Sequence, residues 1–102
     1  MSRLKQLRKL AELEPNDPMS HYGVGLECIN LAEWHEATVA FAKALAVDET
    51  YSAAYYHKAR AEIAAGRGDD ARHTLEAGIA CAVAAADRHT ESEMRELLAS
   101  LA

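Results

Sequence analysis

The sequence contains little that would interrupt a helix, since two prolines and five glycines are all that its 102 residues hold of the strong helix breakers. Aromatic residues make up only 6%, whereas apolar residues make up 50% and are largely alanine, the best helix former. No segment alternates as a half-buried strand does. The composition therefore predicts one almost entirely helical domain whose helices pack closely through small side chains.

Basic residues are also scarce. Eleven lysines and arginines against 16 aspartates and glutamates give a net charge of −5 with histidines neutral, which disfavours nucleic acid and anionic membranes as partners. The basic residues near the start, Arg3, Lys5, Arg8 and Lys9, are interpreted as a solvated helix face. We expect neither nucleic acid nor membrane binding.

The two cysteines, Cys28 and Cys81, match no zinc-binding spacing, so free buried thiols in a reducing compartment are expected. The longest apolar run, residues 79–86, is far shorter than the ~20 residues that span a bilayer. Charges throughout the first residues are unlike a secretory signal. These features predict a cytoplasmic protein.

Apolar residues recur at helical spacing in six segments. The first contains Leu4, Leu7 and Ala11 and ends at residues 14–18, EPNDP; later helices are expected over 18–31, 34–47 and about 52–65, with two more from 69 and 90. The predicted N-caps of the second, fifth and sixth helices are Asp17, Asp69 and Thr90. Helices this short with tight turns favour antiparallel hairpins.

Two of these hairpins repeat each other at an offset of 34 residues. Small residues align with small ones and large with large: Gly25 with Ala59, Ala37 with Ala71, Ala44 with Gly78, Tyr22 with Tyr56, and Phe41 with Leu75.

A 34-residue helix–turn–helix unit of this kind resembles the tetratricopeptide repeat. The matching signature residues are Val24, Gly25, Ala37, Phe41 and Ala44 in the first copy and Tyr55, Ala59, Ala71, Leu75 and Gly78 in the second. The resemblance implies an all-α, right-handed superhelix of antiparallel hairpins with about six helices. Residues 1–102 would form one domain: an N-terminal half repeat (1–17), two repeats (18–51 and 52–85) and a C-terminal capping helix (86–102).

Lys58 and Glu62 depart from the family pattern, because they occupy positions that the family usually fills with apolar residues. They are four residues apart and can form an ion pair on a helix. The sequence leaves open whether they are exposed, part of a binding face, or a sign that the second repeat packs at an unusual angle.

In the resembled family, the first helices of the repeats line a concave surface that holds a peptide or a partner helix. The residues at ligand-facing positions here are Met19, Tyr22, Leu26, Ala53, Tyr56 and Arg60, with Asn30 and His57 at the margins. The family's chaperone-tail clamp is not matched, because Leu26 replaces an asparagine and only Arg60 is basic. The resemblance implies a non-catalytic module, without a cofactor, that binds an unidentified protein or peptide as a monomer or weak homodimer.

Two other functions are considered. The chain could self-associate through its terminal helices as an assembly module. A small metal-binding or enzymatic protein is less favoured, because neither His73 nor His89 has a third convergent ligand and no catalytic triad is recognisable. No catalytic or metal-binding residue is assigned.

The stretch HYGVGLEC, residues 21–28, is not a phosphate-binding loop, because no strand precedes its glycines. Gly25 is predicted to lie where two helices cross. Gly23 either opens space on the concave face beside Tyr22 or is merely tolerated in a helix.

Overall fold

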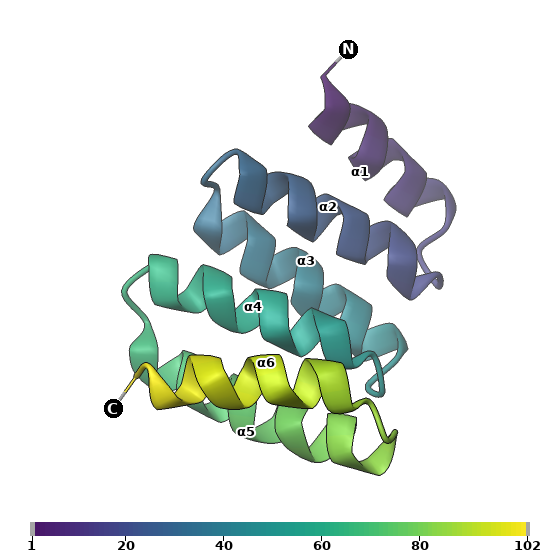
Figure 1. Cartoon of the computed structure of the whole chain (residues 1–102). Coiled ribbons are helices and arrows are strands. Elements are labelled where there is room, and N and C mark those ends of the chain that lie inside the picture. Colours follow the sequence, from purple (N-terminus) through teal and green to yellow (C-terminus); the bar gives the residue numbers. More distant parts are fainter. Residues whose placement is uncertain (1, 102) are drawn as a thin grey trace.

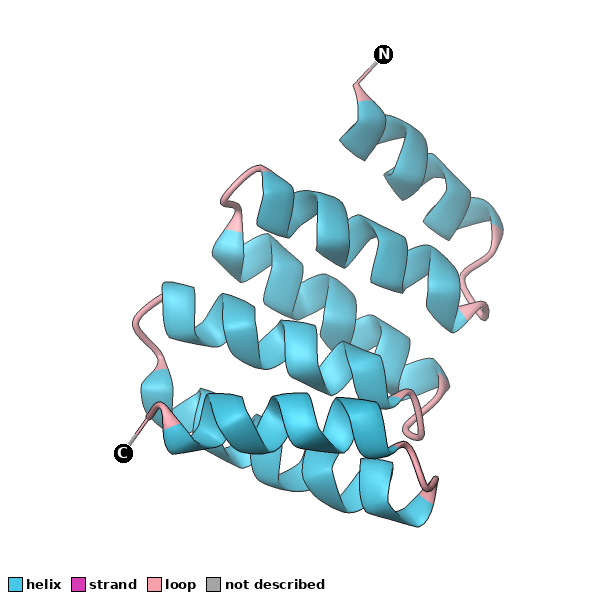
Figure 2. Ribbon diagram, in the orientation of Figure 1, coloured by secondary structure: helices cyan, strands magenta, loops and turns pink. Residues whose placement is uncertain are grey.

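The computed structural model describes residues 2–101 and consists of six helices joined by short turns (Figures 1 and 2). In chain order they are α1 (Arg3–Leu13), α2 (Pro18–Asn30), α3 (Trp34–Val47), α4 (Ser52–Ala64), α5 (Gly68–Ala84) and α6 (Arg88–Ala99). The described residues contain no strand. The all-α prediction, with about six helices, is confirmed.

The helices form a stack of antiparallel hairpins. α2 packs against α3, α4 against α5, and each hairpin contacts the next through α3 and α4 or α5 and α6. α2 also contacts α4, and α4 contacts α6, so these three helices lie side by side on one face of the stack (Figure 1). We call this the α2–α4–α6 face. α1, α3 and α5 form the opposite face.

The predicted N-caps are only partly right. Asp17 caps α2, accepting a hydrogen bond from the Met19 N–H at 2.9 Å. Asp69 is wrong as a cap, because α5 begins at Gly68 and Asp69 lies in its first turn. Thr90 is also wrong: Asp87 caps α6 and accepts from the Thr90 N–H at 3.2 Å.

Two clusters of buried side chains hold the stack together. The first surrounds the fully buried Phe41 and joins α2, α3 and α4. The second surrounds Leu75 and Met94 and joins α4, α5 and α6. Leucines of the C-terminal segment pack against the second cluster, as expected of a capping helix: Leu97, Leu98 and Leu101.

Gly25 lies at a close approach between helices, as the sequence predicts. A Cβ atom at Gly25 would lie only 2.6 Å from ring carbons of Phe41. A Cβ at Gly78 would lie 2.5 Å from Tyr55 Cβ. Gly23 is different, because its Cβ would lie 3.6 Å from Leu7 on α1, an ordinary contact. Gly23 therefore faces α1, and the hypothesis that it opens space beside Tyr22 is wrong.

Lys58 and Glu62 form an ion pair of 3.1 Å, and this pair is inside the second hairpin rather than on an exposed face. Glu62 is only 2% exposed and also accepts a hydrogen bond of 2.7 Å from the Thr74 hydroxyl of α5. We call these three residues the polar cluster. The residues 34 positions earlier are apolar and buried: Val24, Cys28 and Ala40.

The close approach of Gly25 to Phe41 predicts opposite effects for two alanine substitutions on α2. Gly25→Ala should lower the free energy of unfolding by about 1–3 kcal/mol, because the new methyl group overpacks against Phe41. Gly23→Ala, the matched control, should raise it by up to about 1 kcal/mol through helix propensity alone. Urea unfolding followed by circular dichroism measures both. Equal effects of the two substitutions would contradict the packing argument.

We expect the polar cluster to determine which helix pairs with α4 rather than to add net stability to the fold. Glu62→Ala leaves the Lys58 ammonium without its partner and should destabilise the chain by about 3–5 kcal/mol. Replacing all three residues by apolar ones of similar volume, as Lys58→Met, Glu62→Leu and Thr74→Val, should be neutral or stabilising by about 1–4 kcal/mol. Thermal unfolding compares the two variants. A triple variant as unstable as Glu62→Ala would show that the cluster stabilises the fold.

Candidate functional site

The α2–α4–α6 face gathers four of the residues that the sequence predicts for binding. Tyr22 of α2 and Tyr56 and His57 of α4 are half-buried, and Arg60 of α4 is exposed. The other four are placed differently. Met19 and Asn30 are exposed at the start and the end of α2. Leu26 is partly buried against the first core cluster, and Ala53 is half-buried at the start of α4. Their role in binding stays a prediction.

The half-buried rings form one continuous aromatic group. Tyr22 stacks on Tyr51, with ring centroids 4.9 Å apart, and meets His57 edge-on at 5.8 Å. His57 in turn stacks on the buried Phe41 at 6.0 Å and meets Tyr56 edge-on at 5.1 Å. Phe41 therefore supports the face from below. Tyr51 was not predicted, because it lies in the turn before α4 rather than on the expected helix face.

His57 and Tyr56 hold the Arg60 guanidinium in place. Arg60 Nη1 lies 3.1 Å from His57 Nδ1, and its Cζ lies 5.9 Å from the centre of the Tyr56 ring, within the range of a cation–π interaction. A guanidinium can only donate hydrogen bonds, so His57 Nδ1 accepts and the ring carries its proton on Nε2. The contact requires a neutral His57.

Burial and neighbouring charges favour that neutral state. Burial, with a smaller contribution from the Arg60 charge, lowers the pKa of His57 below its ordinary value of 6.5, while Glu93 of α6 acts in the opposite direction. Burial also raises the pKa of Tyr22, helped by Tyr51 and Glu93. At neutral pH the face thus presents uncharged rings, with Arg60 as a cation and Glu93 as an anion.

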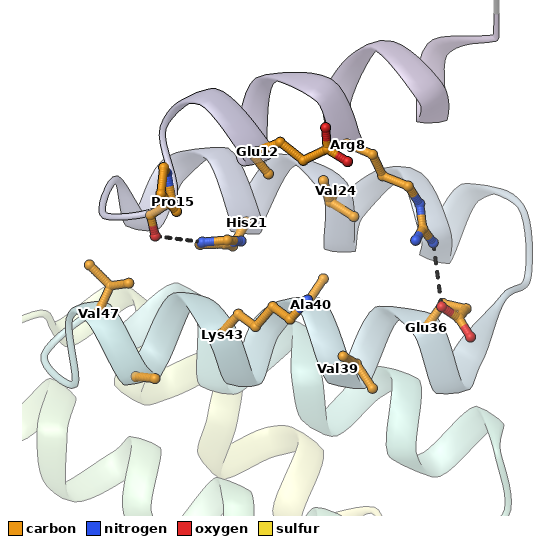
Figure 3. A pocket seen from close by; sticks show the side chains of 12 residues that line it. Arg8, Glu12, Pro15, His21, Val24, Glu36, Val39, Ala40, Lys43 and Val47 are labelled. Carbon is orange, nitrogen blue, oxygen red and sulfur yellow. Dashed lines mark hydrogen bonds and ion pairs between the residues drawn. The ribbon is translucent and has the colours of Figure 1, made fainter.

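A hollow lies on the opposite side of the molecule, between α1 and α3 (Figure 3). Its volume is 550 Å³, and Val24 and Ala40 are among the apolar residues that line it. Arg8 of α1 pairs with Glu36 of α3 at 3.4 Å. No local pattern in the sequence predicts this groove, because it depends on the distance between two helices of the same face.

The turn beside this groove has a counterpart in the second hairpin. His21 Nε2 lies 2.8 Å from the Pro15 carbonyl oxygen, and 34 residues later the Tyr55 hydroxyl donates to the Glu49 carbonyl at 2.9 Å. A smaller hollow of 330 Å³ lies beside Tyr55 and Cys81. Hollows on this side are therefore a recurring product of the stacking.

Two further histidines, His73 on α5 and His89 on α6, lie in simpler surroundings. His73 lies 3.8 Å from Glu76 and His89 lies 3.3 Å from Glu93, and both imidazoles are exposed. Within residues 2–101, no three His, Cys, Asp or Glu side chains are grouped as a metal ion requires. Cys28 and Cys81 are free thiols, Cys28 buried and Cys81 half-buried. In the same part of the chain, no helix is both long and apolar enough to cross a membrane.

The lowered pKa of His57 predicts a loss of stability in acid. The unfolded chain binds a proton at this imidazole near pH 6.5, whereas the folded chain resists protonation until a lower pH. The contribution of His57 to stability is thus complete above pH 6.5 and is lost as the pH falls through the folded-state pKa. From about pH 7.5 to about pH 5.5, wild type should lose more unfolding free energy than His57→Gln.

Urea unfolding at several pH values makes this measurement. His73→Gln, at an exposed site on α5, is the control and should keep the wild-type loss. Equal losses in wild type and His57→Gln would contradict the assignment of a neutral, acceptor His57.

Comparison with known proteins agrees with this architecture. The family model described as tetratricopeptide repeat matches residues 32–101, which is 70 of the 102 residues and includes α3 to α6. Neither the curated proteins nor the solved structures yield a significant match. Repeats of this family generally mediate protein–protein interaction and are typically non-catalytic. With six helices stacked as hairpins and most of its length matched, the chain belongs to the tetratricopeptide repeat family.

Proposed function

We propose that this chain is a non-catalytic protein-interaction module whose α2–α4–α6 face binds a peptide or a helix of a partner protein. The observation that carries the proposal is the continuous group formed by Tyr22, Tyr51, Tyr56, His57 and Arg60. Residues 18–51 and 52–85 would be the two repeats that supply this group. The reduced thiols of Cys28 and Cys81 support action in the cytoplasm.

The tyrosines suit a binding face because each offers a wide, rigid contact area that ends in a hydroxyl group. The stacking of Tyr22 on Tyr51 restricts both rings before a partner arrives, which reduces the entropy lost on binding. Both rings keep part of their surface in solvent. They are therefore available to the apolar side chains of a partner.

Arg60 gives the face a fixed positive charge. One of its N–H groups is used by His57, and the others remain available to hold a carboxylate, which a guanidinium binds with two parallel hydrogen bonds. Because Arg60 is already restrained by Tyr56 and His57, less side-chain entropy is lost on binding. The partner segment we propose carries an acidic side chain beside an apolar or aromatic one.

Removing Tyr56 and Arg60 together tests this face. The double variant Tyr56→Ala/Arg60→Ala should lose a partner captured by wild type, because buried aromatic and arginine contacts in interfaces are each worth about 2 kcal/mol or more, roughly 30-fold in affinity. Capture from a lysate of the source cell, followed by mass spectrometry, identifies the partner. Circular dichroism should show unchanged helical content.

The control variant also removes one apolar and one basic side chain, but from the opposite face. Val39→Ala/Lys43→Ala deletes one large apolar residue and one cation from the wall of the α1–α3 groove and should retain capture. Should the control lose the partner while Tyr56→Ala/Arg60→Ala keeps it, the binding site is the groove and the proposed face is wrong.

A further inference from the structure

The two outer helices of the stack each have an uncovered face within residues 2–101. α6 contacts α5 and α4 just as α4 contacts α3 and α2, so α6 takes the place of the first helix of a hairpin. α1 contacts α2 as the second helix of a preceding hairpin would. Placed on the α6 of another copy, α1 would therefore complete a hairpin.

The burial pattern sets the register of α6 against the earlier first helices. Asp87 caps α6 as Asp17 caps α2, and the buried Thr90 and Met94 then align with the buried Ser20 and Val24. In this register Arg95 falls at the position of Gly25 in α2 and of Ala59 in α4.

An arginine at that position is incompatible with a second helix packed there. At Gly25 even a single Cβ atom would lie 2.6 Å from the Phe41 ring, and Ala59 is completely buried. Arg95 instead points to solvent, 59% exposed, and pairs with Glu91 at 2.8 Å. The ion pair lies on the face of α6 that a further helix would cover.

The outer face of α1 carries a second arginine in a matching place. Arg3 precedes Ala37 by 34 residues and Ala71 by twice that number, and both alanines are completely buried against the first helix of their hairpin. Arg3 is 74% exposed and lies 3.6 Å from Glu27. Nearby Leu10 occupies the position of the buried Ala44 and is 47% exposed.

We propose that Arg3 and Arg95 prevent copies of this chain from stacking head to tail. Leu10 on α1 and Leu98 on α6 offer apolar surface for such stacking, since Leu98 is only partly buried. Closing the junction would bury both arginines between the two helices, separate them from Glu27 and Glu91, and leave two positive charges desolvated and unpaired. The wild-type chain is therefore protected against dimerisation through its terminal helices.

Two single variants test the proposal without putting the fold at risk, because both arginines are exposed. Arg3→Ala removes the arginine from α1 alone, and Arg95→Ala removes the arginine from α6 alone. By light scattering, each variant alone should keep the monomer mass of 11.1 kDa. An equimolar mixture should form a dimer of twice that mass, in which α1 of the Arg3→Ala variant packs on α6 of the Arg95→Ala variant.

The double variant Arg3→Ala/Arg95→Ala should form longer assemblies as its concentration rises, and adding Leu10→Asp should return it to the monomer. Lys43→Ala/Arg67→Ala removes the same charge from exposed positions outside α1 and α6 and should stay monomeric. The proposal is wrong if the mixture and the double variant both remain monomeric at every concentration. It is also wrong if the charge control associates as strongly as the double variant.

Discussion

The contact between Gly25 and Phe41 is the constraint on which the rest of the structure depends. It allows α2 and α3 to approach so closely that a methyl group has no room, and it fixes the Phe41 ring beneath the α2–α4–α6 face. Tyr22 and His57 pack on that ring at 5.7 and 6.0 Å. A glycine buried beneath the face thus determines the height and spacing of the aromatic side chains offered to a partner.

The two hairpins share this geometry but differ in the chemistry of their interiors. Where the first hairpin buries apolar side chains, the second buries the polar cluster of Lys58, Glu62 and Thr74. Buried ion pairs contribute little net stability, because desolvation offsets their attraction, but they tolerate only partners that satisfy every polar atom. The cluster therefore favours α5 over α3 as the second helix of the hairpin that α4 begins, since α3 has Ala40 where α5 has the hydroxyl of Thr74.

The sequence predicted the helices and their small-residue contacts well, because helical periodicity and the 34-residue offset are both local patterns. It predicted the start of α6 wrongly for a physical reason. Ala86 adopts a left-handed conformation with φ 56°, which is normally reserved for glycine, so the chain turns early and Asp87 becomes the cap. The register of α6 then departs from the 34-residue offset, and this is why the influence of Glu93 on the pKa of His57 was not anticipated. Tyr51 was missed because turn residues have no helical periodicity.

The position of α6 links the binding face to the end of the stack. Met94 on one side of α6 is completely buried against Gly78, Glu93 beside it influences the charge of Tyr22 and His57, and Arg95 faces outward. Three consecutive residues therefore contribute to the core, to the proposed recognition face and to the proposed barrier against head-to-tail stacking at α6. Because a helix directs successive residues about 100° apart, one short helix meets all three requirements. A substitution that rotates α6 would disturb the electrostatics of the face even if every residue on α2 and α4 stayed in place.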